Sequence, residues 1–167
     1  MLMLGEDVVE RLYPKYGIAA VGAVVILDNK ILLVKRAYPP GAGKWSIPGG
    51  VVEAGERISD AAMRELREET GLEAEPLGIL WVLNNIVRDE SGRVKYHYVI
   101  VDVLFDSSTL RGELRPGGDV TGVSWFTFEE AVSSPKVSKT VKRLLWRVEN
   151  YGLTFIPLSG VDHETIG

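Results

Sequence analysis

The sequence predicts an α/β fold in which a mixed β-sheet lies between layers of helices, an α/β/α sandwich. Short apolar runs rich in β-branched residues and bounded by turn residues recur along the chain, which is typical of strands. Two segments with helical periodicity, residues 56–70 and 138–151, separate or follow these runs. Strands that are joined both by tight turns and across a helix have antiparallel and parallel neighbours, and this predicts a mixed sheet.

The N-terminal part of the chain holds two strand-like runs. Residues 18–27 (IAAVGAVVIL) and 31–34 (ILLV) are almost entirely apolar, and the Asp-Asn-Lys sequence between them is typical of a turn. We therefore expect one buried hairpin here. Residues 35–44 form a basic loop rich in proline and glycine, which leads to a short strand at residues 45–47. The cationic residues of this loop predict contact with an anionic ligand.

A second pair of strands is expected after the first helix. Residues 77–87 and 96–105 are strand-like and are joined across the polar segment 88–93, so we expect them to pair antiparallel. The polar, glycine-rich segment 106–122 predicts a loop. A short strand is expected at residues 123–126.

The C-terminal part predicts a helix and a tail. Thr127 begins a capped turn, and residues 138–151 carry apolar side chains at helical spacing. Residues 152–167 have no clear periodicity, so we expect a partly ordered tail without a chemical role. Residues 1–151 are predicted to form a single domain.

Composition excludes several classes of protein. The chain has 167 residues, 46% of them hydrophobic, which is enough to build one core. Its formal net charge of −4 disfavours binding to a nucleic-acid polymer, because that needs a basic face. The absence of cysteine excludes disulfides and zinc thiolate sites. No apolar run is long enough for a membrane span, and the first residues do not resemble a secretion signal, so we expect a cytoplasmic protein.

Three glutamates border the apolar face of the first predicted helix. At about 100° per residue, Glu65 and Glu69 fall close to the apolar stripe that contains Leu66, and Glu68 lies beside them. A carboxylate at the edge of an apolar interior loses hydration, which costs several kcal/mol unless a cation compensates it. Mg²⁺, or Mn²⁺ in its place, prefers such oxygen ligands. The alternative is a surface helix held by ion pairs, with Arg64 and Arg67 as the cations.

A glycine-rich approach precedes this helix and points to a known motif. The sequence Trp-Ser-Ile-Pro-Gly-Gly ends at Gly50, and glycines there let the backbone pass close to a ligand. With the helix, this segment resembles the Nudix box of the Nudix hydrolase family, and apolar strands and a C-terminal helix flank it as in that family. The matching positions are Gly50, Glu56, Arg64, Glu65, Leu66, Glu68, Glu69, Gly71 and Leu72.

The resemblance implies a fold, a reaction and a metal site. The fold is the Nudix-type α/β/α sandwich, and the reaction is hydrolysis of a diphosphate in the presence of Mg²⁺. Glu65, Glu68 and Glu69 would hold the metal together with the carbonyl of Gly49. The ions would lower the pKa of the attacking water and neutralise charge on the phosphate oxygens.

The resemblance also assigns supporting and catalytic roles. Arg64 and Glu56 would brace the helix and the loop, Gly50 and Gly71 would serve the motif structurally, and Arg64 would belong with Glu65 and Glu68 to the catalytic group. The general base is left open. The candidates are Glu68, Glu65, and an acid of the later loop, either Glu113 or Asp119.

The substrate is expected to be a small nucleotide diphosphate. Arg36, Tyr38 and His97 are candidates for contact with it, through a phosphate, a base or a sugar. The pattern resembles the ADP-ribose pyrophosphatase and nucleotide-sanitising branch of the family, so ADP-ribose comes first. A proline that many ADP-ribose-cleaving members carry downstream of the box is missing from residues 83–88. A nucleoside triphosphate or an oxidised nucleotide is the alternative.

Two further expectations concern assembly and class. Related ADP-ribose enzymes often form dimers, and the segment from Val8 to Tyr16 is a candidate for such a homodimer contact. Some Nudix-type domains have lost catalysis and sense ligands or bind proteins. Those domains usually have a damaged box, whereas the box of this chain is intact, so an enzyme is favoured over a binding module.

Overall fold

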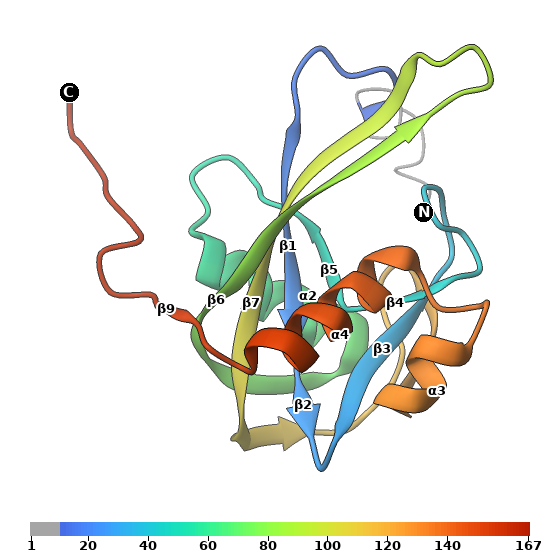
Figure 1. Ribbon diagram of the computed structural model, residues 1–167. Coiled ribbons are helices and arrows are strands. Elements are labelled where there is room, and N and C mark those ends of the chain that lie inside the picture. The colour runs from blue at the N-terminus through green and yellow to red at the C-terminus, as the bar shows by residue number, and fades with distance from the viewer. Residues whose placement is uncertain (1–10) are drawn as a thin grey trace.

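Two β-sheets form the centre of the computed structural model, which describes residues 11–167 (Figure 1). The first sheet has five strands, in the order β5 (Gly49–Val51), β1 (Ile18–Val24), β7 (Val94–Gly112), β6 (Leu72–Arg88) and β9 (Ile156–Pro157). The second sheet contains β2 (Ile26–Leu27), β3 (Lys30–Arg36), β4 (Trp45–Ser46) and β8 (Val120–Thr127). In the first sheet β1 runs parallel to β7, whereas the other pairs are antiparallel. The predicted mixed sheet is therefore confirmed.

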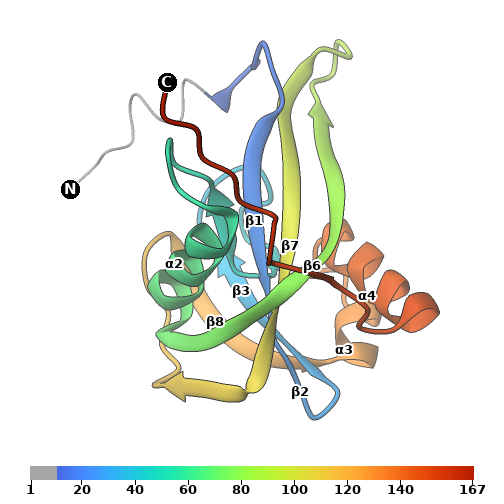
Figure 2. The same cartoon turned by 90° about the vertical axis from the view of Figure 1, so that its left-hand side faces the viewer.

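Helices lie on opposite sides of the strands (Figure 2). The helix α2 (Ile58–Thr70) packs Ala62 and Leu66 against side chains of β1 and β7 to form one core. The helix α4 (Lys139–Tyr151) packs Leu144 and its neighbours against β3 and the other face of the first sheet. The short helix α3 (Phe128–Ser133) contributes Ala131 to this second core, which α4 forms with the strands. This arrangement confirms the α/β/α sandwich.

The prediction of a single N-terminal hairpin is wrong. The apolar run 18–27 breaks at Val25, so that β1 belongs to the first sheet and β2 to the second. Only β2 forms a hairpin with β3, around Asp28 and Asn29, which both have positive φ. Both halves of the run are largely apolar, so composition does not reveal where the chain crosses between sheets.

The long hairpin of β6 and β7 was predicted, but its extent was not. The strands pair antiparallel as expected, and β7 continues to Gly112, inside the segment predicted to be a loop. That prediction is wrong for residues 106–112, and also for residues 120–122, which belong to β8. The extension is polar and is held by cross-strand pairs: Arg111 Nη2 lies 3.1 Å from Glu73 Oε2. Apolar alternation, on which the prediction relied, is absent there.

The helix ends follow from their capping residues. Gly71 ends α2 with φ 73°, in the left-handed conformation that glycine adopts without strain, as predicted. The helix begins at Ile58, two residues later than expected. Thr127 and Glu130 form a capping box at the start of α3, and the Ser138 side chain caps α4. The two later helices therefore begin where their side chains can satisfy free backbone N–H groups.

The C-terminal residues pack partly against the long hairpin. Strand β9 pairs with Gly78 and Ile79, and a Cβ atom on Gly78 would lie 2.2 Å from the carbonyl oxygen of Ile156. Farther on, Glu164 lies 3.6 Å from Arg57, next to the start of α2.

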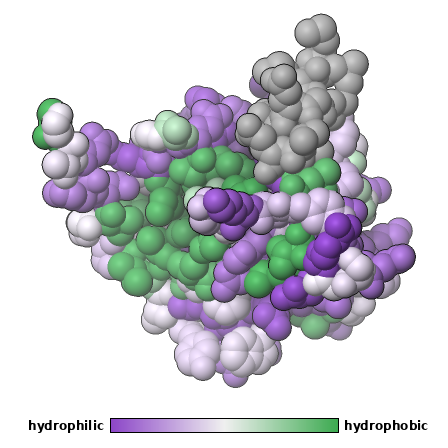
Figure 3. Space-filling view, turned by 90° about the horizontal axis from the view of Figure 1, so that it is seen from above, coloured by the Kyte–Doolittle hydropathy of each residue, from purple (hydrophilic) through white to green (hydrophobic). Residues whose placement is uncertain are grey.

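Seen from above, hydrophobic residues gather over one part of the surface (Figure 3). Within residues 11–167, no helix has the length and hydrophobicity needed to cross a bilayer.

Asp102 is an isolated carboxyl in the core of the first sheet. Only 2% of its surface is exposed, and its Oδ2 atom accepts a hydrogen bond of 2.9 Å from Trp81 Nε1. Its Oδ1 atom is buried without a hydrogen-bond partner among residues 11–167 and lies so close to Gly22 that a Cβ atom there would be 2.2 Å away. Burial raises the pKa of Asp102 to about 7, although the Trp81 hydrogen bond acts in the opposite direction.

We predict that Asp102→Asn changes the pH dependence of stability. Between about pH 4, where the unfolded carboxyl ionises, and about pH 7, the folded protein keeps a proton that the unfolded chain releases. Wild-type stability contains a term that falls through this window by about 1.4 kcal/mol per pH unit. Asn does not titrate, so the free energy of unfolding of the variant lacks this term. The stability of the variant relative to the wild type therefore increases as the pH rises.

Urea unfolding at pH 5 and pH 7 measures this gain. Asp162→Asn, at an exposed position of the tail, is the matched control and leaves the pH dependence unchanged. Equal stability differences at both pH values for Asp102→Asn would contradict the prediction.

Candidate functional site

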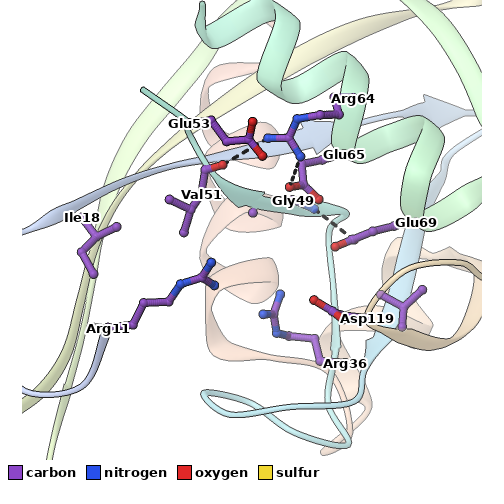
Figure 4. Close-up of a pocket in the computed structure, with 12 residues that line it drawn as sticks. Arg11, Ile18, Arg36, Gly49, Val51, Glu53, Arg64, Glu65, Glu69 and Asp119 are labelled. Carbon is purple, nitrogen blue, oxygen red and sulfur yellow. Dashed lines mark hydrogen bonds and ion pairs between the residues drawn. The ribbon is translucent and has the colours of Figure 1, made fainter. Parts of the chain in front are cut away.

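A polar pocket opens between α2, β5, the end of β3 and the loop before β8 (Figure 4). Its volume is about 510 Å³. One wall carries acids and glycines of the predicted motif, and the other carries two arginines and an aspartate. The lining residues used below are Arg11, Arg36, Gly49, Glu65, Glu69 and Asp119.

The acidic wall is formed by the inner edge of α2. Because Ala62 and Leu66 fix that helix on the core, Glu65 and Glu69 are directed toward β5. Glu69 is only 6% exposed, and its Oε2 atom accepts a hydrogen bond of 3.2 Å from the Gly49 N–H. The helix therefore holds a carboxylate at the border between the core and the pocket.

The two acids of this wall have raised pKa values. Burial is the main cause for Glu69, and the negative charge of Glu65 adds to it, so that the pKa of Glu69 rises to about 8. Burial also raises the pKa of Glu65, against the opposing effect of Arg64. Without a further cation, this pair retains a proton at neutral pH.

Arg64 ties the acidic wall to the loop before the helix. Its Nε and Nη2 atoms donate to the two oxygens of Glu56 at 2.7 and 2.9 Å, and Nη1 donates to Glu65 Oε1 at 2.8 Å. Nη2 also donates to the carbonyl of Val51 at 3.2 Å. The hydrogen bond from Arg64 lowers the pKa of Glu56, and the same pairing raises the pKa of Arg64. These hydrogen bonds fix the position of α2 relative to β5 and to the loop before the helix.

The two glycines of β5 allow the strand to approach the acidic side chains of α2 closely. A Cβ atom on Gly50 would lie 2.3 Å from Glu65 Oε1, and one on Gly49 would lie 2.2 Å from the Val21 carbonyl. The backbone of β1 therefore restricts position 49 to glycine, whereas a side chain at position 50 would displace the Glu65 carboxyl group. The strand can lie against the carboxylates only because these side chains are absent.

The donor set fits a hard divalent cation. The buried Glu69 and the partly buried Glu65 have raised pKa values and lie beside a polar pocket, and only Glu65 is paired with Arg64. Within residues 11–167, no three acidic or histidine side chains form a preformed metal cage. Mg²⁺ can bind through one or two carboxylates when water and substrate phosphates complete its coordination.

The opposite wall is basic. Arg36, at the end of β3, extends into the pocket, and its Nε atom is buried without a hydrogen-bond partner among the described residues. Arg11 reaches the pocket from the segment before β1 (Figure 4). Asp119, from the loop before β8, lies on the same side as Arg36.

The structure brings together some of the predicted residues and leaves others outside. Glu68 lies on the outer side of Glu65, half exposed, with one oxygen 3.4 Å from Arg64 Nη1. Tyr38 is 45% exposed and does not line the pocket. His97 points to the sheet face opposite the buried Tyr98 and contacts Asn84 Oδ1 at 3.2 Å.

Two residues that line the pocket, Asp119 and Arg11, were not among the main site residues predicted from the sequence. Of the two loop acids considered as a base, Asp119 lines the pocket and Glu113 does not. Arg11 was missed altogether, because a single arginine before the first strand has no motif around it. Its only sequence signal is a cation among apolar and aromatic residues. The N-terminal dimer segment, Val8 to Tyr16, lies partly outside the described residues.

Comparison with known proteins gives consistent matches. The family model described as NUDIX domain matches residues 18–146. An ADP-ribose pyrophosphatase of Methanocaldococcus jannaschii is 37% identical over 107 residues, which cover 64% of this chain and 60% of that protein. The nucleoside triphosphatase NudI of Escherichia coli is 33% identical over 111 residues, 63% of this chain and 78% of that protein.

A solved structure supports the same grouping. The crystal structure of a MutT NUDIX hydrolase from Burkholderia pseudomallei superimposes with a TM-score of 0.69 at 28% identity. The match covers 80% of this chain and 99% of that one. The chain therefore shares nearly the whole fold of that protein.

We predict that Arg64→Ala destabilises the fold by about 3 kcal/mol, because it leaves Glu56 and Glu65 without their cation. Arg64→Lys restores little of this loss, since one ammonium group cannot replace the forked contacts. Arg67→Ala, at an exposed position of the same helix, is the matched control. Urea unfolding measures all three. A loss for Arg64→Ala no larger than that for Arg67→Ala would contradict the prediction.

Proposed function

Because this chain belongs to the Nudix hydrolase family and is a diphosphatase of that family, we propose that it cleaves ADP-ribose to AMP and ribose 5-phosphate. The observation that carries the proposal is the pair Glu65 and Glu69, held against Gly49 on the wall of a polar pocket. The similarity to the archaeal ADP-ribose pyrophosphatase supports the choice of substrate. Since the aligned part spans 60% of that protein, its activity is transferred to this chain only as part of the proposal.

Mg²⁺ is the proposed cofactor, and Mn²⁺ can replace it. Glu65, Glu68, Glu69 and the carbonyl of Gly49 would hold it, with Glu68 completing the set from the outer side of the wall. When bound, the metal would lower the pKa of water and neutralise charge on the phosphate oxygens. The raised pKa values of Glu65 and Glu69 support this assignment, because a bound cation would offset the loss of hydration that is their main cause.

The side chains of the chain itself supply position and proton transfer. Arg64 holds Glu65 in place and Glu56 fixes Arg64, so these residues act by positioning. Asp119 is the proposed general base, because it lines the pocket on the side opposite Glu69. Its carboxylate would accept the proton of the attacking water. Glu65 and Glu68 remain alternatives.

A second candidate is hydrolysis of a nucleoside triphosphate or an oxidised nucleotide. Its support is the similarity to NudI and the lack of a proline at residues 83–88. A non-catalytic sensing role is the alternative from another class, and the intact acidic wall argues against it. A cytoplasmic location and a homodimer are also proposed here, on the grounds given by the sequence.

We predict that Glu69→Gln lowers kcat by about 100-fold or more while the fold is kept, because a charge that the bound metal requires is lost. Glu68→Gln is expected to act in the same direction. Chelation of divalent ions abolishes wild-type turnover, and added Mg²⁺ restores it. Asp60→Asn, an exposed acid on the same helix, is the control with wild-type rate. A near wild-type rate for Glu69→Gln would refute the assignment.

We further predict that ADP-ribose gives the highest kcat/KM in a panel with Mg²⁺ that also contains nucleoside triphosphates and oxidised nucleotides. Chromatography of the products separates the two candidates: ADP-ribose gives AMP and ribose 5-phosphate, whereas a triphosphate gives a monophosphate and pyrophosphate. A triphosphate cleaved with higher kcat/KM would replace the first candidate by the second. Metal binding without turnover of any compound would support the sensing role.

A further inference from the structure

We propose that Arg11 and Arg36 form a guanidinium pair that binds the substrate phosphate farther from the acidic wall. Arg11 is then a substrate-binding residue supplied by the segment before β1, outside the motif that carries the other functional residues. The proposal rests on the proposed diphosphate substrate, because it assigns the second phosphate of that group a place in the same pocket.

The first support is the direction of the two side chains. Arg11 and Arg36 come from distant parts of the chain, yet both guanidinium groups point into the pocket and face Gly49, Glu65 and Glu69 (Figure 4). The proposed metal would bind the oxygens of the phosphate that lies near the acidic wall. The adjoining phosphate of the same diphosphate would then meet the arginines. Planar guanidinium groups are suited to phosphate oxygens, because each can donate two parallel hydrogen bonds.

The second support is an unsatisfied donor. The Nε atom of Arg36 is buried and donates to no described residue, although buried polar atoms of folded proteins are nearly always paired. None of the ion pairs within residues 11–167 includes Arg36. No side-chain hydrogen bond or ion pair within residues 11–167 holds this guanidinium, so its terminal amino groups can donate to an anionic ligand in the pocket.

The third support is that Arg11 is held in position by its neighbours. The Tyr13 N–H donates to the Lys95 carbonyl at 2.9 Å, which ties the segment to β7. Leu12 packs on the cluster around Tyr96 and Tyr98. Burial raises the pKa of Tyr98, and the positive charges of Arg11 and Arg36 oppose this effect, as expected for two cations near one hydroxyl. The arginine therefore has a defined place beside the pocket.

Steady-state kinetics on the diphosphate that the wild type cleaves best is the first test. Arg11→Ala is expected to raise KM by about 10- to 100-fold with little change in kcat, because a charge-assisted hydrogen bond to the bound substrate is lost. Arg11→Lys gives an intermediate KM. The double variant with Arg36→Ala loses less than the product of the single losses, because both side chains bind one phosphate.

The matched control is Lys15→Ala. This lysine is an exposed cation of the same segment and does not line the pocket, so its removal changes the net charge equally. Its KM is expected to remain that of the wild type. An unchanged KM for Arg11→Ala, or an equal rise for Lys15→Ala, overturns the proposal.

A binding measurement separates this proposal from the proposed activity. Inorganic pyrophosphate is titrated calorimetrically into the full chain with a chelator present and without metal. The wild type and Lys15→Ala bind it with equal affinity, and Arg11→Ala and Arg36→Ala bind about 10- to 100-fold more weakly. Failure of the proposed activity would leave this result intact, whereas a wild type that does not bind pyrophosphate overturns the guanidinium pair.

Discussion

The burial of two neighbouring carboxyl groups at the edge of the core is the constraint on which the site depends. Glu65 and Glu69 lie one turn apart on α2, and the packing of Leu66 prevents the helix from turning them toward solvent. Burial is the main cause of their raised pKa values, and the negative charge of Glu65 adds to it for Glu69. Arg64 is paired with Glu65, whereas the charge of Arg36 only partly offsets the raised pKa of Glu69. The folded chain therefore keeps an unmet requirement for a cation beside the pocket.

The surrounding structure can be understood as the support for this arrangement. The Arg64 network joins α2 to the loop and to β5, so that the helix cannot move away from the strand. Gly49 and Gly50 let the strand lie against the carboxylates, where any side chain would collide with Glu65 or with β1. Strand β5 is in turn paired with β1, the parallel neighbour of β7. The rigid sheet thus fixes the position of the acidic wall.

The parts that the sequence predicts are those with short-range causes. The end of α2 at Gly71 and the contacts of Arg64 with Glu56 depend on residues close in sequence, and fixed spacing reveals them. The division of run 18–27 between two sheets depends on distant partners, so composition cannot show it. Arg11 is the clearest case at the site. Its place in the pocket results from the packing of its segment on β7, which no local pattern records.

Comparison of the two buried acids explains why one suits a metal site and the other does not. Asp102 and Glu69 both lose hydration, and both have raised pKa values. Asp102 lies against Trp81 and Gly22 and does not line the polar pocket, so taking up a proton is its means of neutralisation. Glu69 borders a polar pocket of about 510 Å³ and has a charged neighbour in Glu65. An ion that brings its own waters can reach Glu69, and binding it releases the proton that the pair would otherwise hold. Access to a pocket, more than burial alone, therefore separates a structural acid from the proposed metal ligand Glu69.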